Sequence, residues 1–456
     1  MSDSCTIALA EFVEGLRYKD IPPEAIEAAK RAILDTIGVT MRGSREPVSK
    51  IMQQFIVKEQ CKEEANIIGT RVRSSVANCA FCTGIFAHAL DYDDVYYDLS
   101  GSTRIHASAP LIASCLGLSE NIMAKGAAFI EAFVAGIEVI GAINRGLGST
   151  HYVRGWHATS TVGALGAAAT ASKLLKLKKE EIQVAFGIAT SLASGSRQNF
   201  GTMVKPIHVG NAARVGVLSA IFARDGITAE KEILDKPMGF AIFSEEGDWN
   251  PRKAIRSSED PWAIIHPGLQ IKRYPSCGGT HRALDALFHI LHEERSLSLN
   301  DIVDISVIAS RPPHALIHHR PISGLQGKFS MEYCITAGIF DGHIGINSFS
   351  DAAVLRREIQ AFLDKIQLKT QQDLPSKTVR VEINCKKGVK LSDEVLHPIG
   401  SPPNPISWVD LEEKYRDCVG DLLASNDLER SLKGIKNFEN LDSVNDMIKL
   451  FTRVET

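Results

Sequence analysis

Residues 161–177 read TVGALGAAATASKLLKL, a stretch rich in alanine and glycine. Gly163 and Gly166 lie one helical turn apart, and small residues at that spacing let neighbouring helices approach closely. The stretch therefore predicts a helix inside a compact helical core.

Most of the first 240 or so residues have the same helical character. Pro23 and Glu24 predict a helix start, because proline is tolerated in a first turn and glutamate favours the positive end of a helix. Residues 124–142 are mostly apolar, and residues 209–224 are again rich in alanine and glycine. We therefore expect one helix after another in this part of the chain.

The pattern changes after about residue 265. Residues 302–310 and 378–384 alternate between apolar and polar side chains, which is typical of β-strands. Helices are expected between them, at residues 280–293 and 328–340. This segment therefore predicts a smaller unit that mixes helices and strands.

A proline-rich joint at residues 398–405 precedes a last helical segment. With 456 residues, the chain exceeds what one hydrophobic core usually holds. The sequence therefore predicts a mainly α fold with two domains. A large all-helical domain is expected from residues 1–268 and 405–456, with a smaller α+β lid domain, residues 269–404, inserted between them.

The charge balance argues against nucleic acid as a partner. The 51 Lys and Arg residues and 54 Asp and Glu residues give a net charge of −3, and the basic residues are spread along the chain. No run of 18 uncharged apolar residues is present, so we expect no membrane-spanning helix. The N-terminus, MSDSC, has no basic region followed by an apolar stretch. We therefore expect no secretory signal and a cytoplasmic protein, with an organelle matrix as the alternative.

The densest group of titratable residues lies within 19 positions of the chain: His88, Asp91, Asp93, Asp94 and His106. Such groups are costly to bury unless they are paired, solvated or functional. Helix capping is the structural alternative for each aspartate. An Asp–Asp pair that holds Mg²⁺ together with phosphates is a minor alternative.

Three residues that can bind or protonate an anion directly precede expected helices. They are His106, His157 and Lys205. The start of a helix offers free N–H groups and a positive dipole, which favour anions. We therefore expect these residues, with His208 close behind Lys205, to meet at a site for a small anionic substrate.

A second basic group lies at the expected domain junction, where ligand clefts often form. Lys272, Arg273, Tyr274 and Cys277 precede two glycines, residues 278–279, which let a ligand approach the backbone. The pattern matches neither a Walker loop nor a Rossmann fingerprint. Cys277 is open to two interpretations, a nucleophile or a thiol that lines the cleft.

Several motifs together resemble the MmgE/PrpD family. They are HALDYDD at 88–94, HASAP at 106–110, GWH at 155–157, KPIHVGNAAR at 205–214 and GKFSMEY at 327–333. The motifs follow the family's order, and the resemblance covers nearly the whole chain. The family includes 2-methylcitrate dehydratase, cis-aconitate decarboxylase and iminodisuccinate epimerase. The resemblance implies a large helical domain, a smaller α+β lid, a homodimer and no metal.

Matched to the cis-aconitate decarboxylase site, the resemblance implies catalytic roles for five residues: Asp91, His106, His157, Lys205 and Lys272. Three single positions depart from that site. Val95 replaces a threonine, Cys277 replaces a histidine of the animal enzyme, and Ile317 replaces a tyrosine of the lid. Residues 103–109 read TRIHASA, where the 2-methylcitrate dehydratases carry Trp-Gly-His-Pro-Ser-Asp-Asn. Decarboxylation, dehydration and epimerisation therefore all stay open.

The leading hypothesis is a cofactor-independent lyase that acts on a small di- or tricarboxylate. His106 and His157 would move protons, and Asp91 would orient one imidazole. Lys205 and Lys272 would hold carboxylates and stabilise a carbanion. The residues expected to bind substrate are Arg273, Tyr274, Cys277, His208 and Asp94.

No cofactor and no metal are expected, and the expected partner is a small carboxylate. An epimerase of a dicarboxylate such as iminodisuccinate is the first alternative, since it needs only two proton-transfer groups on opposite faces. A non-catalytic helical binding protein is the second alternative.

Overall fold

Helix α8 (Ala158–Leu174) is buried at every residue except Lys173. A Cβ atom added at Gly166 would lie 2.6 Å from Cγ1 of Ile140, on the neighbouring helix α6 (Gly126–Gly146). A larger residue would therefore push these two helices apart. The small-residue stretch lies in a helical core, as predicted, and the chain as a whole is mainly helical.

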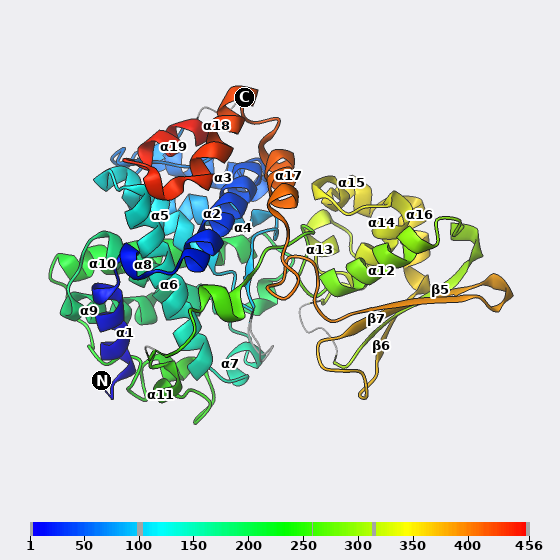
Figure 1. The fold of residues 1–456 in the computed structure, drawn as a ribbon, viewed down its shortest axis with the longest axis horizontal. Helices are drawn as coiled ribbons and strands as arrows, with labels where there is room; N and C mark the ends of the chain where they lie inside the picture. The colour runs from blue at the N-terminus through cyan, green and yellow to red at the C-terminus, as the bar shows by residue number, and fades with distance from the viewer. Residues whose placement is uncertain (1–2, 98–103, 258, 312–315, 453–456) are drawn as a thin grey trace.

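The computed structural model describes residues 3–97, 104–257, 259–311 and 316–452. Figure 1 shows the helices of the first half gathered in one body, with the last three helices packed against it. The other helices of that half are α1 (Cys5–Gly15), α2 (Pro23–Gly43), α3 (Pro47–Glu59), α4 (Val76–Ala89), α5 (Ser108–Ile122), α7 (Thr150–Val153), α9 (Lys179–Leu192), α10 (Val204–Arg224) and α11 (Pro251–Ala254).

The C-terminal helices return to this body. They are α17 (Trp408–Val419), α18 (Ser425–Lys436) and α19 (Asn445–Phe451). Helices α17 and α18 pack on α2, and α19 packs on α5. Leu411, Phe438 and Phe451 from this segment are buried in the same hydrophobic core as α8. We call α1–α11 together with α17–α19 the helical part.

The remaining elements form a second body, the α+β part, beside the helical part (Figure 1). Its helices are α12 (His281–Glu293), α13 (Gly324–Gly327), α14 (Met331–Asp341), α15 (Asp351–Val354) and α16 (Arg357–Phe362). Its strands are β5 (Ile302–Ala309), β6 (Ile366–Thr370), β7 (Val379–Cys385) and β8 (Lys390–Val395). They form a four-stranded sheet in the order β6-β5-β7-β8, in which only the β5–β6 pair is parallel. Helices α12 and α14 pack on the sheet and share a separate apolar core with it.

Most predicted elements agree with the structure within a few residues. Helix α10 begins earlier than expected, at Val204, so Lys205 lies in its first turn. The helix expected at residues 328–340 begins only after Ser330, whose side chain caps α14. No sequence pattern predicts β6, because only Ile366 in that strand is buried.

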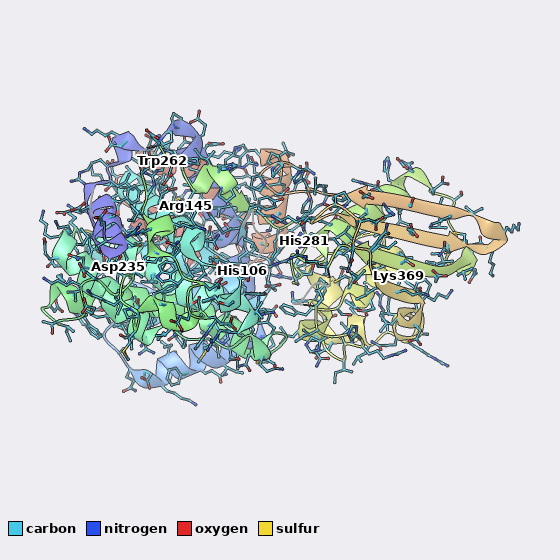
Figure 2. All side chains as sticks on the ribbon, turned by 90° about the horizontal axis from the view of Figure 1, so that it is seen from below. His106, Arg145, Asp235, Trp262, His281 and Lys369 are labelled. Carbon is cyan, nitrogen blue, oxygen red and sulfur yellow. The ribbon has the colours of Figure 1, made fainter. Side chains whose placement is uncertain are left out.

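A short ribbon joins the two parts. Strand β3 (Val95–Tyr96) pairs antiparallel with β4 (Leu269–Gln270), which leads into the α+β part. Figure 2 shows His106 on the side of the helical part nearest the α+β part, and His281 at the junction. A second ribbon, β1 (Ala65–Asn66) with β2 (Arg73–Ser74), lies within the helical part.

Helix α6 is long and apolar enough, by length and composition, to cross a membrane. In the fold, 83% of its apolar window is buried against other helices. A helix that is apolar on all sides is typical of a protein core as well as of a membrane span.

Lys414 of α17 holds several segments together at the junction. Its Nζ atom lies 2.6 Å from Oδ1 of Asp35 in α2. The same ammonium group donates hydrogen bonds to the backbone carbonyl oxygens of Tyr92, at 2.9 Å, and Lys272, at 2.8 Å. Both partners of this ion pair are buried, so the ammonium group of Lys414 compensates the charge of the buried Asp35 carboxylate.

Replacing Lys414 with methionine should destabilise the protein by about 3 kcal/mol, because the Asp35 carboxylate would be left buried without its partner. Urea unfolding followed by circular dichroism measures the loss. The control is Lys449→Met, which removes an exposed ion pair with Asp446 and should cost less than about 0.5 kcal/mol. Equal losses in the two variants would contradict the assignment.

Candidate active site

The candidate site begins where α4 ends. The loop that follows this helix places Asp91 in the left-handed backbone region, with φ of +52°. Few residues other than glycine adopt this conformation, although aspartate does so more readily than most. A strained, buried acidic residue at the end of a helix indicates a position that serves function.

Two lysines bind the Asp91 carboxylate. Lys205 Nζ lies 2.5 Å from Oδ1, and Lys272 Nζ lies 3.2 Å from Oδ2 and 2.6 Å from the backbone oxygen of Asp91. All three side chains are buried. Burial alone would raise the pKa of the Asp91 carboxyl, but the two ammonium groups outweigh burial and hold this pKa well below its usual range.

A second carboxylate, Asp93, lies between two imidazoles. Its Oδ1 is 2.8 Å from Nδ1 of His88, and its Oδ2 is 3.1 Å from Nδ1 of His106. The rings of the two histidines meet edge to face, with centroids 4.3 Å apart. Burial lowers the pKa of His106 to about 3, although the Asp93 charge opposes that shift. His106 is therefore a neutral imidazole near neutral pH.

The hydrogen bonds define the proton positions on His88. Its Nδ1 donates to Asp93, so its Nε2 is free to accept a hydrogen bond from Lys205 Nζ at 2.7 Å. Lys205 thus donates to both His88 and Asp91. Of its three N–H groups, one is left for a ligand in the pocket, as far as the described residues show.

A second imidazole pair faces the first. His157 directly precedes α8, and its Nδ1 lies 3.1 Å from Nδ1 of His208 in α10. Burial and the charge of Lys205 lower the pKa of His157 well below its usual range. Burial also lowers the pKa of His208, to about 4.

These groups border a small pocket with a cavity volume of about 20 Å³. The lining residues come from both parts of the molecule: Asp91, Val95, Arg104, His106, Tyr152, His157, Phe200, Lys205, Cys277, Gly278 and Phe329. Apolar rings cover the Lys205 ammonium, which lies 5.2 Å from the ring centre of Phe200 and 5.1 Å from that of Phe329. A charge in such dry surroundings interacts strongly with an anionic ligand.

The structure brings together most of the predicted site residues. Asp91, His106, His157, Lys205 and Cys277 line the pocket. Lys272 touches Asp91 from behind, and His208 touches His157.

Four of the five predicted substrate-binding residues lie outside the pocket lining, His208 among them. The hydroxyl of Tyr274 donates to Asp285 of α12, at 2.8 Å, and Arg273 is exposed. Both oxygens of Asp94 accept from Ser108, from its hydroxyl and from its backbone N–H at 3.2 Å, so this carboxyl caps α5. The structure thus supports the capping alternative for Asp94.

Several lining residues escaped the sequence analysis. Tyr152, Phe200 and Phe329 carry no charge, and nothing in their local sequence separates them from core aromatic residues. Arg104 lies two residues before His106, and this position was the one feature of the sequence that could have identified it as a site residue. Ile317, one of the departures from the family pattern, is 45% exposed, and Thr103 of the 103–109 stretch lies outside the described residues.

Four side chains could hold a metal ion by spacing alone. The ligand atoms of His88, Asp91, Asp93 and His106 all lie within 4.8 Å of one another. The Lys205 ammonium, however, is already hydrogen-bonded to both His88 and Asp91. A divalent cation between them would be repelled by this ammonium group. The donor set therefore suits a hydrogen-bonded ion cluster better than a metal centre.

The chain matches two protein-family descriptions. Residues 7–252 match the MmgE/PrpD N-terminal domain, and residues 274–440 match the MmgE/PrpD C-terminal domain. The cis-aconitate decarboxylase of Homo sapiens is 29% identical, over 97% of this chain and 93% of that protein. The Mus musculus cis-aconitate decarboxylase is 27% identical (99% and 94%), and that of Aspergillus terreus is 24% identical (98% and 95%).

The cap formed by Asp94 predicts a pH-dependent stability. Burial raises the pKa of this carboxyl to about 7, against 3.8 for an ordinary aspartate. The folded protein therefore holds a proton that the unfolded chain releases, and this contribution to stability is complete below pH 4 and lost as the pH rises through 7. Asp94→Asn has no such proton. Its stability relative to wild type should rise by on the order of 1 kcal/mol per pH unit between pH 4 and 7 and level off above pH 8.

Urea unfolding of both proteins at pH 5, 6, 7 and 8.5 measures this difference. The matched control is Asp446→Asn, at an exposed carboxylate, which should differ from wild type by the same amount at every pH. A constant difference for Asp94→Asn as well would mean that Asp94 is ionised in the folded protein.

Proposed function

The chain belongs to the MmgE/PrpD family, and on this premise we propose that it is a cofactor-independent carboxy-lyase acting on a small tricarboxylate such as cis-aconitate. The observation that carries the proposal is the cluster of two ammonium groups and two imidazoles around Asp91, with His157 at the same small pocket. The names of the full-length relatives support the choice of decarboxylation over the other reactions of the family.

The proposed reaction needs one proton and no oxidant. The bond between the methylene carbon of cis-aconitate and its carboxylate breaks, and CO₂ leaves. The electron pair forms a new double bond to the central carbon, while the old double bond shifts its electrons to the carbon beside the other terminal carboxylate. That carbon takes a proton. The products are itaconate and CO₂, so one proton is consumed in each turnover.

The chain's residues supply what this reaction requires. Lys205 would hold a substrate carboxylate with its remaining N–H and stabilise negative charge as it spreads over the allyl system. Lys272 does not line the pocket, so its part is to keep Asp91 in place and to add positive charge. His106 and His157 line the pocket and would move the proton.

The protonation states of the histidines are consistent with these roles. Burial lowers the pKa values of both imidazoles, which favours their neutral form before substrate binds. A bound polyanion favours the charged form of a neighbouring imidazole and would raise these values again. We propose that substrate binding itself prepares His106 or His157 as the proton donor.

The proposal includes closure by the α+β part. Cys277, Gly278 and Phe329 border the pocket from that side, and Lys328 Nζ donates to the backbone oxygens of Leu90, at 2.7 Å, and Pro275, at 3.0 Å. We propose that the inserted segment, residues 269–404, acts as a lid that excludes water during the reaction. A homodimer and a cytoplasmic location stay predictions.

Proton NMR of the wild-type protein with cis-aconitate in D₂O tests the proposed function. We expect itaconate with one deuterium on its methylene carbon, since the proton added comes from solvent. His106→Ala and His157→Ala should each lower turnover by about 100-fold or more, the usual contribution of a general acid or base. The matched control is His289→Ala, which removes an exposed histidine of α12 and should keep full turnover.

Near wild-type turnover in both site variants would overturn the roles given to these histidines. Deuterium that enters the substrate without net conversion would favour an epimerase instead. Loss of activity on treatment with a chelator would favour a metal-dependent enzyme. If none of the added carboxylates is converted and none raises the melting temperature, the non-catalytic binding protein is favoured.

A further inference from the structure

The described pocket lining contains two cations, Lys205 and Arg104, and Lys205 already forms an ion pair with Asp91. The charged residues of that lining are Asp91, Arg104 and Lys205. Asp91 is neutralised by Lys205 together with Lys272. Arg104 forms no ion pair with any carboxylate among the described residues. A guanidinium group that borders a pocket without a carboxylate is suited to bind an anion from outside.

The backbone around Arg104 is well anchored. The next residue, Ile105, accepts a hydrogen bond from Tyr96 N at 2.8 Å, which extends the β3–β4 ribbon. The residue after it, His106, donates its N–H to Thr159 Oγ1 at 3.0 Å. Arg104 is therefore tied to the same framework that positions the imidazole of His106, and its side chain lies at a defined edge of the pocket.

Gly278 lies opposite the Arg104 guanidinium, close to its Nη1 atom. A Cβ atom added at Gly278 would come within 3.5 Å of Nη1 of Arg104. Gly278 and Cys277 line the same pocket from the α+β side. An anion bound to the guanidinium would lie beside a glycine backbone, where no side chain of residue 278 competes for the space.

A second arginine adds positive charge nearby. Burial and the neighbouring Arg104 guanidinium lower the pKa of Arg282 in α12. Arg282 uses its Nε–H to bind the backbone oxygen of Leu396, at 2.8 Å. Two guanidinium groups that repel each other are stabilised when an anion binds beside them.

We propose that Arg104 binds a second substrate carboxylate, separate from the one held at Lys205, and that this contact selects tricarboxylates over dicarboxylates. The inference rests on the proposed function for its choice of substrate class. The ligand would span the pocket, with one carboxylate at the Lys205 end and another between Arg104 and Gly278. The apolar walls of Val95, Phe200 and Phe329 would face the short carbon chain between them.

The test compares two unreactive ligands that differ by one carboxylate. Propane-1,2,3-tricarboxylate carries three, and 2-methylsuccinate has the same skeleton with one terminal carboxylate replaced by hydrogen. Isothermal titration calorimetry should show that wild-type protein binds the tricarboxylate about 10- to 100-fold more tightly, the usual range for a charged hydrogen-bonded contact. In Arg104→Gln the two ligands should bind with nearly equal affinity. Arg104→Lys should retain part of the difference, because lysine keeps the positive charge but lacks the planar guanidinium that binds a carboxylate with two hydrogen bonds.

The matched control is Arg154→Gln, which removes the same charge from an exposed residue at the end of α7 and should keep the full difference. An undiminished preference for the tricarboxylate in Arg104→Gln would overturn the inference, as would wild-type protein that binds neither ligand. Turnover of cis-aconitate, measured separately, distinguishes the two proposals. Conversion to itaconate with an unchanged preference in Arg104→Gln would support the proposed function and contradict the Arg104 contact. A preference that is lost in Arg104→Gln, with no turnover of cis-aconitate by the wild-type protein, would support the Arg104 contact and contradict the proposed function.

Discussion

The structure depends on the charge balance at Asp91. This carboxylate and its partners Lys205 and Lys272 are buried, and each ion costs several kcal/mol to remove from water unless it is paired. The two lysines lie 114 and 181 positions further along the chain. The site can therefore form only when the end of α4, the start of α10 and the segment after β4 have come together. Lys414 and Lys328 bind backbone oxygens of the same segments, so the interior holds four lysines that tie the site to its surroundings.

Local patterns predict the elements of this fold better than they predict its contacts. The alanine and glycine of residues 161–177 predict a buried helix because close helix packing requires small residues, and α8 fulfils this requirement. Strand β7 was predictable because its side chains alternate between buried and partly exposed positions. Strand β6 was not, because its neighbours in the sheet, rather than its own side chains, make it a strand.

The same distinction holds for the site. His106, His157 and Lys205 could be selected from the sequence because each lies at or just before the start of a helix, and all three line the pocket. Tyr274 lies only two positions from Lys272, yet its hydroxyl binds Asp285 away from the pocket. The direction of a side chain in an irregular segment depends on contacts with distant residues, and a single sequence does not contain them. Asp94 differs from Asp91 for the same reason, since its partner is the start of α5 rather than a lysine.

The site combines fixed positive charge with neutral imidazoles, and this combination has a consequence for catalysis. Ammonium and guanidinium groups hold carboxylates through charged hydrogen bonds. Burial lowers the pKa of His106 despite the nearby Asp93 charge, and burial together with Lys205 lowers the pKa of His157, so both imidazoles favour the neutral form. The proposed decarboxylation consumes one proton and would receive it after the substrate enters, when the anion makes an imidazolium favourable. Binding and protonation are then coupled, and a ligand with too few carboxylates would be both weakly held and poorly protonated. Selectivity for a polyanion and the supply of the proton would thus have a single physical cause.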